Sequence, residues 1–114
     1  MSNTLRIVGT LIELAPMRFT PAGVAVIHCV LGHASRQVEN GVERDVECEL
    51  PAIALGDMAQ RMRVAGCGWE IEATGFLAAK SKRSKGPVLH ITNIEFLKGI
   101  DNGFQTEESK QQGR

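Results

Sequence analysis

Four cationic side chains lie close together in one polar segment of this chain: Lys80, Lys82, Arg83 and Lys85. The residues between them are serines, and no carboxylate interrupts the run. A cationic loop of this kind can bind the phosphate backbone of a nucleic acid and release condensed counterions, which gives affinity independent of base sequence. The alternative is a solvated hairpin loop. We favour nucleic-acid binding because the strand pattern predicts a fold in which this loop holds ligands.

Arg18, Phe19 and Arg44 are the other candidates for a nucleic-acid interface. Arg18 would extend the cationic track, Phe19 is placed to stack on a base, and Arg44 flanks the loop between the second and third expected strands. Stacking contributes about 1–3 kcal/mol per base in single-strand binders. The chain has only four Phe, one Trp and no Tyr. This scarcity of aromatic side chains predicts weak binding.

Carboxylates alternate along the third expected strand, at Glu43, Asp45, Glu47 and Glu49. Alternate residues of a strand point to the same face, so the four carboxylates share one face. They would repel phosphates if that face lay in a nucleic-acid groove. The face is therefore expected to meet either a basic protein partner or water.

The cysteines and histidines predict neither a metal site nor a disulfide framework. The three cysteines form no CxxC pair, and the spacing fits no zinc knuckle. His28 and Cys29 would point to opposite faces of a strand, which prevents them from sharing one ion easily. We therefore expect no metal and no cofactor.

Enzyme motifs are absent from the sequence. There is no GxxxxGK phosphate loop and no nucleophile elbow around a serine. A row of similar carboxylates lacks the contrasting environments that acid–base catalysis needs. The formal net charge is zero, from 13 Lys plus Arg against 13 Asp plus Glu, which argues against a uniformly basic coat but leaves room for a local patch. The sequence predicts a non-enzymatic protein.

Apolar alternation predicts strands through most of the chain. We expect five strands, over residues 4–14, 24–33, 42–50, 69–79 and 88–97. Thr20–Gly23 and Gly66–Gly68 have turn chemistry, and Asn40-Gly41 is a strong hairpin signal. Other expected features are a polar loop over 34–39, a strand stop or edge at Pro51, a helix over 58–64 capped by Asp57, and a polar loop over 80–87.

Five strands with glycines inside the first and fourth, at Gly9 and Gly75, indicate a small closed barrel, because such glycines mark bulges or tight bends. The five-stranded OB-fold barrel, an all-β architecture, matches this plan. OB-folds bind oligonucleotides with the face of strands two and three and with the loops between strands one and two and strands four and five. Those loops would be residues 15–23 and 80–87.

The chain has 114 residues, of which 43% are hydrophobic, enough for one domain with a core. We expect this domain over 1–98 and a flexible polar tail over 99–114. No apolar run approaches the length of a membrane helix, and the first residues lack signal-peptide features. The sequence predicts a cytoplasmic protein that has no membrane partner.

The sequence resembles the family of primosomal replication protein N, PriB, over about residues 3 to 97. The residues that carry the resemblance are Asn3-Thr4-Leu5, Val8-Gly9-Thr10, Pro21-Ala22-Gly23, His28-Cys29-Val30-Leu31-Gly32-His33, Cys48-Glu49-Leu50-Pro51, Thr74-Gly75-Phe76 and Val88-Leu89-His90. It implies a homodimer of OB-folds related to bacterial single-stranded DNA-binding protein. It also implies an accessory of replication restart and primosome assembly that binds single-stranded DNA and the PriA helicase, with DnaT as a further partner where that protein exists.

By the same resemblance, the family's loop lysines match the Lys80–Lys85 cluster, and Arg18 and Arg44 match basic positions. Three residues depart from the family pattern. Glu47 replaces a tryptophan of some relatives, Val42 replaces an aromatic residue, and Ala34 replaces a basic one. Each change removes stacking or charge, so we expect weak, salt-sensitive DNA contact. The alternatives are a protein–protein adaptor with little DNA affinity and an RNA-binding OB-fold.

Overall fold

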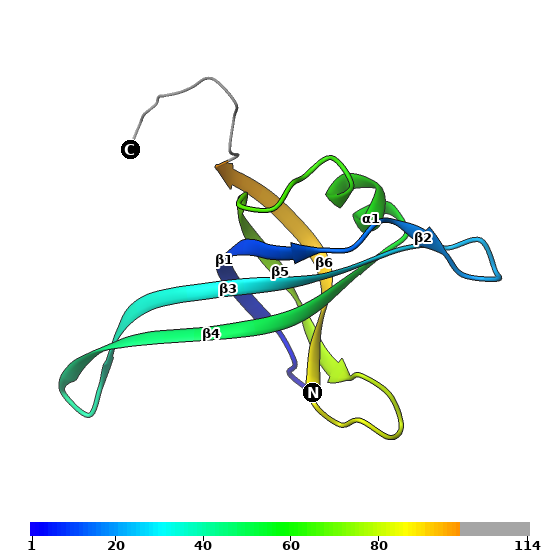
Figure 1. The fold of residues 1–114 in the computed structure, drawn as a ribbon. Coiled ribbons are helices and arrows are strands. Elements are labelled where there is room, and N and C mark those ends of the chain that lie inside the picture. The colour runs from blue at the N-terminus through cyan, green and yellow to red at the C-terminus, as the bar shows by residue number, and fades with distance from the viewer. Residues whose placement is uncertain (99–114) are drawn as a thin grey trace.

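A computed structural model describes residues 1–98 of the chain, and the tail expected over 99–114 lies outside these residues. The strands and the helix follow one another as shown in Figure 1. In chain order they are β1 (Leu5–Leu14), β2 (Arg18–Phe19), β3 (Ala25–Glu39), β4 (Val42–Leu55), α1 (Asp57–Met62), β5 (Glu70–Ala79) and β6 (Pro87–Lys98).

Five long strands close into a barrel. The sheet runs in the order β1-β5-β6-β4-β3-β2, and an additional pairing between β1 and β3 joins the two sides into a ring. The two-residue strand β2 pairs with the first two residues of β3, through Arg18↔Val26 and Phe19↔Ala25. All contacts within the ring are antiparallel except the short parallel pairing of β4 with β6. This confirms the predicted all-β, five-stranded OB-fold.

The barrel interior is filled by aliphatic side chains from every long strand. The fully buried large residues are Leu11, Ile27, Leu31, Met62, Ile71, Leu89 and Ile94. Within β3, Ile27, Cys29 and Leu31 are buried at alternate positions, as a strand period of two requires. Helix α1 contributes Ala59 and Met62 to this core.

Helix α1 is shorter than the predicted range of 58–64, and its capping differs from the prediction. Gly56 is the N-cap, with φ of 61°, and no side chain caps the helix. Asp57 is therefore the first helical residue rather than the cap. Its carboxylate still lies in the first turn, where negative charge is favoured by the exposed amide groups.

Gly75 was predicted to mark a bulge or a tight bend, and it lies at an irregularity in the pairing of β5. The pairing of β5 with β6 shifts register between Thr74 and Gly75. A Cβ atom at residue 75 would overlap the backbone carbonyl of His90. Gly9 is also closely approached, since a Cβ there would lie 2.9 Å from the carbonyl oxygen of Gly32. Glycine is required at both positions because the backbone of a neighbouring strand comes too close to leave room for a side chain.

The largest difference from prediction is the length of β3 and β4. The segment 34–39, expected as a loop, is strand, and β3 pairs with β4 from Val26↔Leu55 to Glu39↔Val42. The turn between them is the predicted Asn40-Gly41, with φ of 55° and 79°. Beyond Gly32, β3 no longer pairs with β1. Residues 33–48 thus form a two-stranded arm that projects from the barrel (Figure 1).

Pro51 does not stop β4, contrary to one of the two expectations for it. The strand continues to Leu55. Pairing with β6 begins only at Ala52, so at Pro51 β4 has β3 as its one paired neighbour. This is an edge-like position, where the missing N–H of a proline is tolerated.

Candidate nucleic-acid interface

The cationic loop, residues 80–86, joins β5 to β6 and ends one residue earlier than expected, because Pro87 begins β6. Lys80 N donates to Gly86 O at 3.1 Å, and Ser81 N donates to Ser84 O at 3.0 Å. The Ser81 hydroxyl also accepts hydrogen bonds from the backbone N–H groups of Arg83 and Ser84. The serine between the cations therefore folds the loop into a turn.

The four cationic side chains of this loop are exposed. None of the ion pairs found within residues 1–98 involves Lys80, Lys82, Arg83 or Lys85. Their charges are thus available to a ligand. The hydrogen bonds that shape the loop come from its backbone and from a serine, not from these four side chains. A ligand could therefore bind the cations without disturbing the loop's hydrogen bonds.

Strand β2 presents Arg18 and Phe19 to solvent. The Phe19 side chain is 58% exposed, consistent with a free aromatic face in the predicted binding loop. The sequence placed both residues in a loop over 15–23, whereas the structure pairs them with β3. The turn after β2 is closed by a hydrogen bond from Gly23 N to Thr20 O at 2.8 Å.

The structure brings Arg18 next to a residue that the sequence did not assign to the interface. The Arg18 guanidinium lies 2.9 Å from Nε2 of His28. His28 is exposed on the outer face of β3, between the buried residues Ile27 and Cys29. Partial burial lowers the pKa of His28 from its ordinary value of 6.5, and the positive charges of Arg18 and Lys80 lower it further.

A concave surface lies between the cationic loop and the outer face of the sheet, with a volume of about 470 Å³. We call it the loop cavity. It is lined by His28 of β3, Ile53 of β4, His90 of β6 and Lys80 of the loop, among others. Arg18 does not line the cavity itself but contacts His28, which does. Residues 18, 28 and 80, far apart in sequence, thus meet at one site because the barrel closes.

The wall of the loop cavity continues as a row of neighbouring side chains across four strands. His28 pairs with Ile53, Ile53 with His90, and His90 with Phe76 of β5. The rings of Phe76 and His90 stack with centroids 5.1 Å apart and planes at 11°. Sequence reasoning missed His90 and Phe76 as surface residues near the interface. The signal for His90 was its place between the buried residues Leu89 and Ile91.

Arg44 does not join the other candidate residues. It lies on the arm, where its guanidinium forms an ion pair with Glu39 at 2.7 Å. The tip of the arm and the cationic loop project from the barrel in different directions (Figure 1). Of the seven residues predicted for the interface, the structure therefore separates Arg44 from the others.

The predicted acidic face is present on the arm and where it meets the barrel. Glu43, Asp45, Glu47 and Glu49 are all exposed. Arg36 of β3 lies opposite and pairs with Glu43 at 3.6 Å and Asp45 at 3.5 Å. This arginine partly neutralises the outer half of the acidic face.

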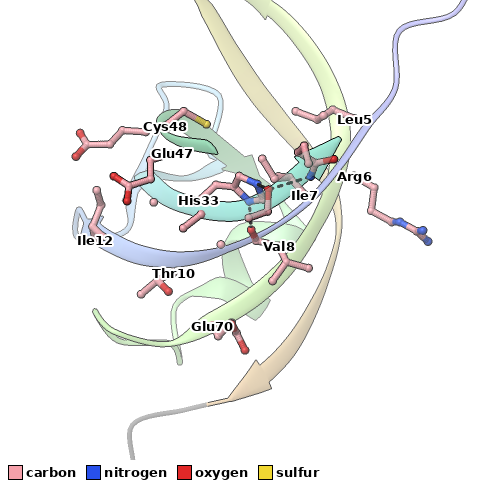
Figure 2. Close-up of a pocket in the computed structure, with 16 residues that line it drawn as sticks. Leu5, Arg6, Ile7, Val8, Thr10, Ile12, His33, Glu47, Cys48 and Glu70 are labelled. Carbon is pink, nitrogen blue, oxygen red and sulfur yellow. Dashed lines mark hydrogen bonds between the residues drawn. The ribbon is translucent and has the colours of Figure 1, made fainter. Parts of the chain in front are cut away.

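A second hollow, which we call the groove, separates the first half of β1 from the arm (Figure 2). It has a volume of about 1050 Å³ and is lined by Leu5, Ile7 and Val8 on one side and by His33 and Cys48 on the other. His33 Nδ1 lies 2.6 Å from Val8 O, and its Nε2 lies 2.8 Å from the Ser35 hydroxyl. Because a carbonyl can only accept, Nδ1 carries the donated proton.

Residues 1–98 contain no group of three or more metal-ligating side chains. The helix in this part of the chain lacks the length and the apolar character needed to span a bilayer.

Comparison with known proteins places this arrangement among single-strand binding proteins. Residues 3–93 match a family model described as "another single-strand binding protein family". The replication restart protein PriB of Nitrosomonas europaea is 38% identical over 95 residues, covering 83% of this chain and 88% of the relative. PriB of Neisseria meningitidis serogroup C is 43% identical over 98 residues, covering 85% and 97%.

Solved structures agree with the sequence relatives. The PriB structure of Ralstonia solanacearum superposes with a TM-score of 0.77 at 35% identity, covering 84% of this chain and 98% of that one. The single-stranded DNA binding protein of Thermus aquaticus gives a TM-score of 0.67 at 27% identity, covering 87% of this chain and 52% of that one.

Proposed function

This chain belongs to the PriB family of replication restart proteins, within the single-strand binding proteins, and from that premise we propose that it is a non-enzymatic accessory of replication restart that binds single-stranded DNA in the cytoplasm. The observation that carries the proposal is the cationic loop, whose four exposed cations lie outside every ion pair found in residues 1–98. Arg18 extends this positive surface across the loop cavity.

The strand of DNA would lie along the loop cavity, between the cationic loop and β2. Lys80, Lys82, Arg83 and Lys85 contact phosphates from one side, and Arg18 does so from the other. Phe19, which is exposed beside Arg18, offers a stacking surface for one base. Four or five phosphate contacts would give a salt slope of roughly −3 for a single strand. One stacking residue adds about 1–3 kcal/mol, so the affinity is modest and strongly salt-dependent.

Fluorescence anisotropy with a labelled oligothymidylate at several salt concentrations tests this proposal. In the triple variant Lys82→Glu, Arg83→Glu and Lys85→Glu, we expect at least a tenfold loss of affinity and a salt slope smaller by about 2, because three phosphate contacts are lost. Arg83→Glu alone is compared with Arg63→Glu, an exposed arginine just after α1. Unchanged affinity and slope in the triple variant would contradict the loop assignment.

We also propose that the protein is a homodimer formed along the groove. Residues 5–9 of β1 pair with β5 on one edge only, and residues 33–39 of β3 pair with β4 on one edge only. Unpaired edges of this kind readily pair with a second copy of the same strand. Val8, which is 39% exposed in the groove, supplies apolar contact.

Sedimentation of two single variants tests the dimer. Val8→Glu places a charge in the groove and is expected to shift the protein from dimer to monomer. Val64→Glu is the matched control, since Val64 is 65% exposed and lies after α1, outside the groove. Equal sedimentation of the two variants contradicts this interface.

The exposed acidic face supports a second part of the function, contact with protein partners. We propose the PriA helicase as the main partner, and DnaT where it exists. A pull-down with the helicase, with and without DNA, compares the loop triple variant with Glu43→Gln, Asp45→Asn, Glu47→Gln and Glu49→Gln combined. Binding lost only in the second variant favours an adaptor with little DNA affinity. Competition between RNA and DNA oligonucleotides tests the RNA-binding alternative.

A further inference from the structure

A histidine that lines the loop cavity contacts one cation and feels the charge of a second, and the DNA-binding proposal assigns it no role. His28 faces Arg18 of β2 and Lys80 of the cationic loop, and its pKa is lowered by partial burial and by both of these charges. The other titratable groups that line this cavity are Glu13 of β1, Cys29 of β3 and His90 of β6. His28 is exposed on the outer face of the sheet, so a ligand in the cavity can reach it.

The contact with Arg18 defines the protonation state of His28 in the free protein. A guanidinium can only donate hydrogen bonds, and its Nη atom lies 2.9 Å from Nε2 of the imidazole. Nε2 therefore accepts and carries no proton. His28 is neutral in this arrangement, and a proton added to Nε2 would break the contact and create a third positive charge beside Arg18 and Lys80.

A bound phosphate would reverse this balance. One phosphate of the DNA backbone carries a full negative charge, which attracts Arg18 and Lys80 and favours the charged form of a nearby imidazole. Once Arg18 turns from the imidazole to the phosphate, Nε2 is free to take up a proton from solvent and donate it in a hydrogen bond to a phosphate oxygen. A hydrogen bond between two charged groups is stronger than one between neutral groups.

We propose that Arg18, His28 and Lys80 form a phosphate subsite in which His28 takes up a proton when single-stranded DNA binds. The subsite rests on the proposed DNA-binding function and adds a pH dependence to it. The complex holds more protons than the free protein, so affinity rises as pH falls through the range in which bound His28 is charged and free His28 is neutral. The steepest expected slope is about tenfold in affinity per pH unit for each subsite occupied.

Binding isotherms at constant ionic strength between about pH 5.5 and 8 test the proposal. The probe is a rhodamine-labelled oligothymidylate, because thymine does not titrate in this range. We expect the affinity of the unmodified protein to rise at least threefold as pH falls across this range. In His28→Gln, which keeps hydrogen-bonding capacity without titrating, the pH dependence is expected to flatten. His90→Gln, which removes the other cavity histidine, is expected to retain it.

The His28 imidazole resonance, assigned by its absence from His28→Gln, gives an independent measure. Its pKa is expected to rise on addition of saturating oligothymidylate. Binding that is independent of pH, or a pH dependence lost in His90→Gln rather than in His28→Gln, overturns the subsite and leaves the proposed function standing. Absence of binding at every pH and at low salt overturns the proposed function and the subsite with it.

Discussion

The two halves of the β3–β4 ribbon are built from the same two strands, yet they are stabilised in different ways. In the half that belongs to the barrel, Ile27, Cys29 and Leu31 point into the core, and β1, β2 and β6 pair alongside. In the arm, the two strands have only each other, and Val38 and Val42 are 68% and 64% exposed. Continuous pairing therefore does not imply uniform stability, because burial accompanies only one half.

Thiol reactivity is expected to show the largest difference between the halves. Burial raises the pKa of Cys29 from 9.0 to about 11, whereas Cys48 on the arm is exposed. A rise of about two pKa units lowers the thiolate fraction about a hundredfold, and burial blocks access as well. In dilute native protein, Cys48 and the exposed Cys67 should react readily with a disulfide reagent, and Cys29 should react only on unfolding.

The same pKa shift predicts how stability depends on pH. The unfolded chain loses the Cys29 proton above about pH 9, and the folded chain keeps it up to about pH 11. The free energy of unfolding should therefore fall as pH rises through this window. Cys29→Ala removes this contribution, and denaturant curves at pH 8 and 10 measure it. If Cys29 in the native protein reacted with the disulfide reagent as fast as Cys48, the difference between the halves would be contradicted.

Truncating one apolar side chain in each half gives the next largest effect. Leu31→Ala removes a fully buried side chain and should lower the free energy of unfolding by about 2–5 kcal/mol. Val42→Ala, on the arm, should change it by less than about 0.5 kcal/mol. Urea unfolding curves compare the two variants. Similar losses would mean that the arm is stabilised by packing after all.

The hairpin turn offers a local test of the arm. Gly41 has a φ of 79°, and a Cβ there would meet nothing within 4 Å. Gly41→Ala should therefore cost about 1–2 kcal/mol through backbone strain alone. Gly86→Ala is the control for stability, because a Cβ there also meets open space and its backbone is not left-handed. Hydrogen exchange should accelerate in the arm and not in the barrel; faster exchange in both would show that they unfold together.

The smallest effect is expected from the ion pairs of the arm. Arg36→Ala breaks the contacts with Glu43 and Asp45, which are long and exposed to solvent. Exposed pairs contribute about 0–1 kcal/mol and are screened by salt. Thermal melts at low and high salt should therefore differ little from those of the unmodified protein. A large drop in melting temperature at low salt would show that these ion pairs, and not strand pairing alone, stabilise the arm.

The barrel could be predicted from the sequence because each of its strands carries an apolar face, and Gly75 marked a place where β6 comes too close for a side chain. The arm could not be predicted in full, since residues 34–39 have no core to face and so lack apolar alternation. The cationic loop was visible in the sequence because its four cations lie within six consecutive residues. The role of His28 was hidden, because its neighbours Arg18 and Lys80 approach it only after β2 and the cationic loop are positioned by the closed barrel.

The connections within the barrel also bear on how the chain folds. The hairpins β3–β4 and β5–β6 join neighbouring segments, whereas the parallel pairing of β4 with β6 spans only Ala52–Ala54 and links distant ones. Closing the short loop of a hairpin costs little conformational entropy. We therefore expect the two hairpins to form before the parallel pairing of β4 with β6, which we call the seam. Ile91 pairs with Gly75 in the β5–β6 hairpin and with Ala54 in the parallel pairing, so only part of its contacts form early. Ile91→Val should then speed unfolding more than it slows folding; the opposite balance would contradict this order. The His28–Ile53–His90 row crosses the parallel pairing of β4 with β6, so the surface on which DNA would lie is complete only once these two strands have met.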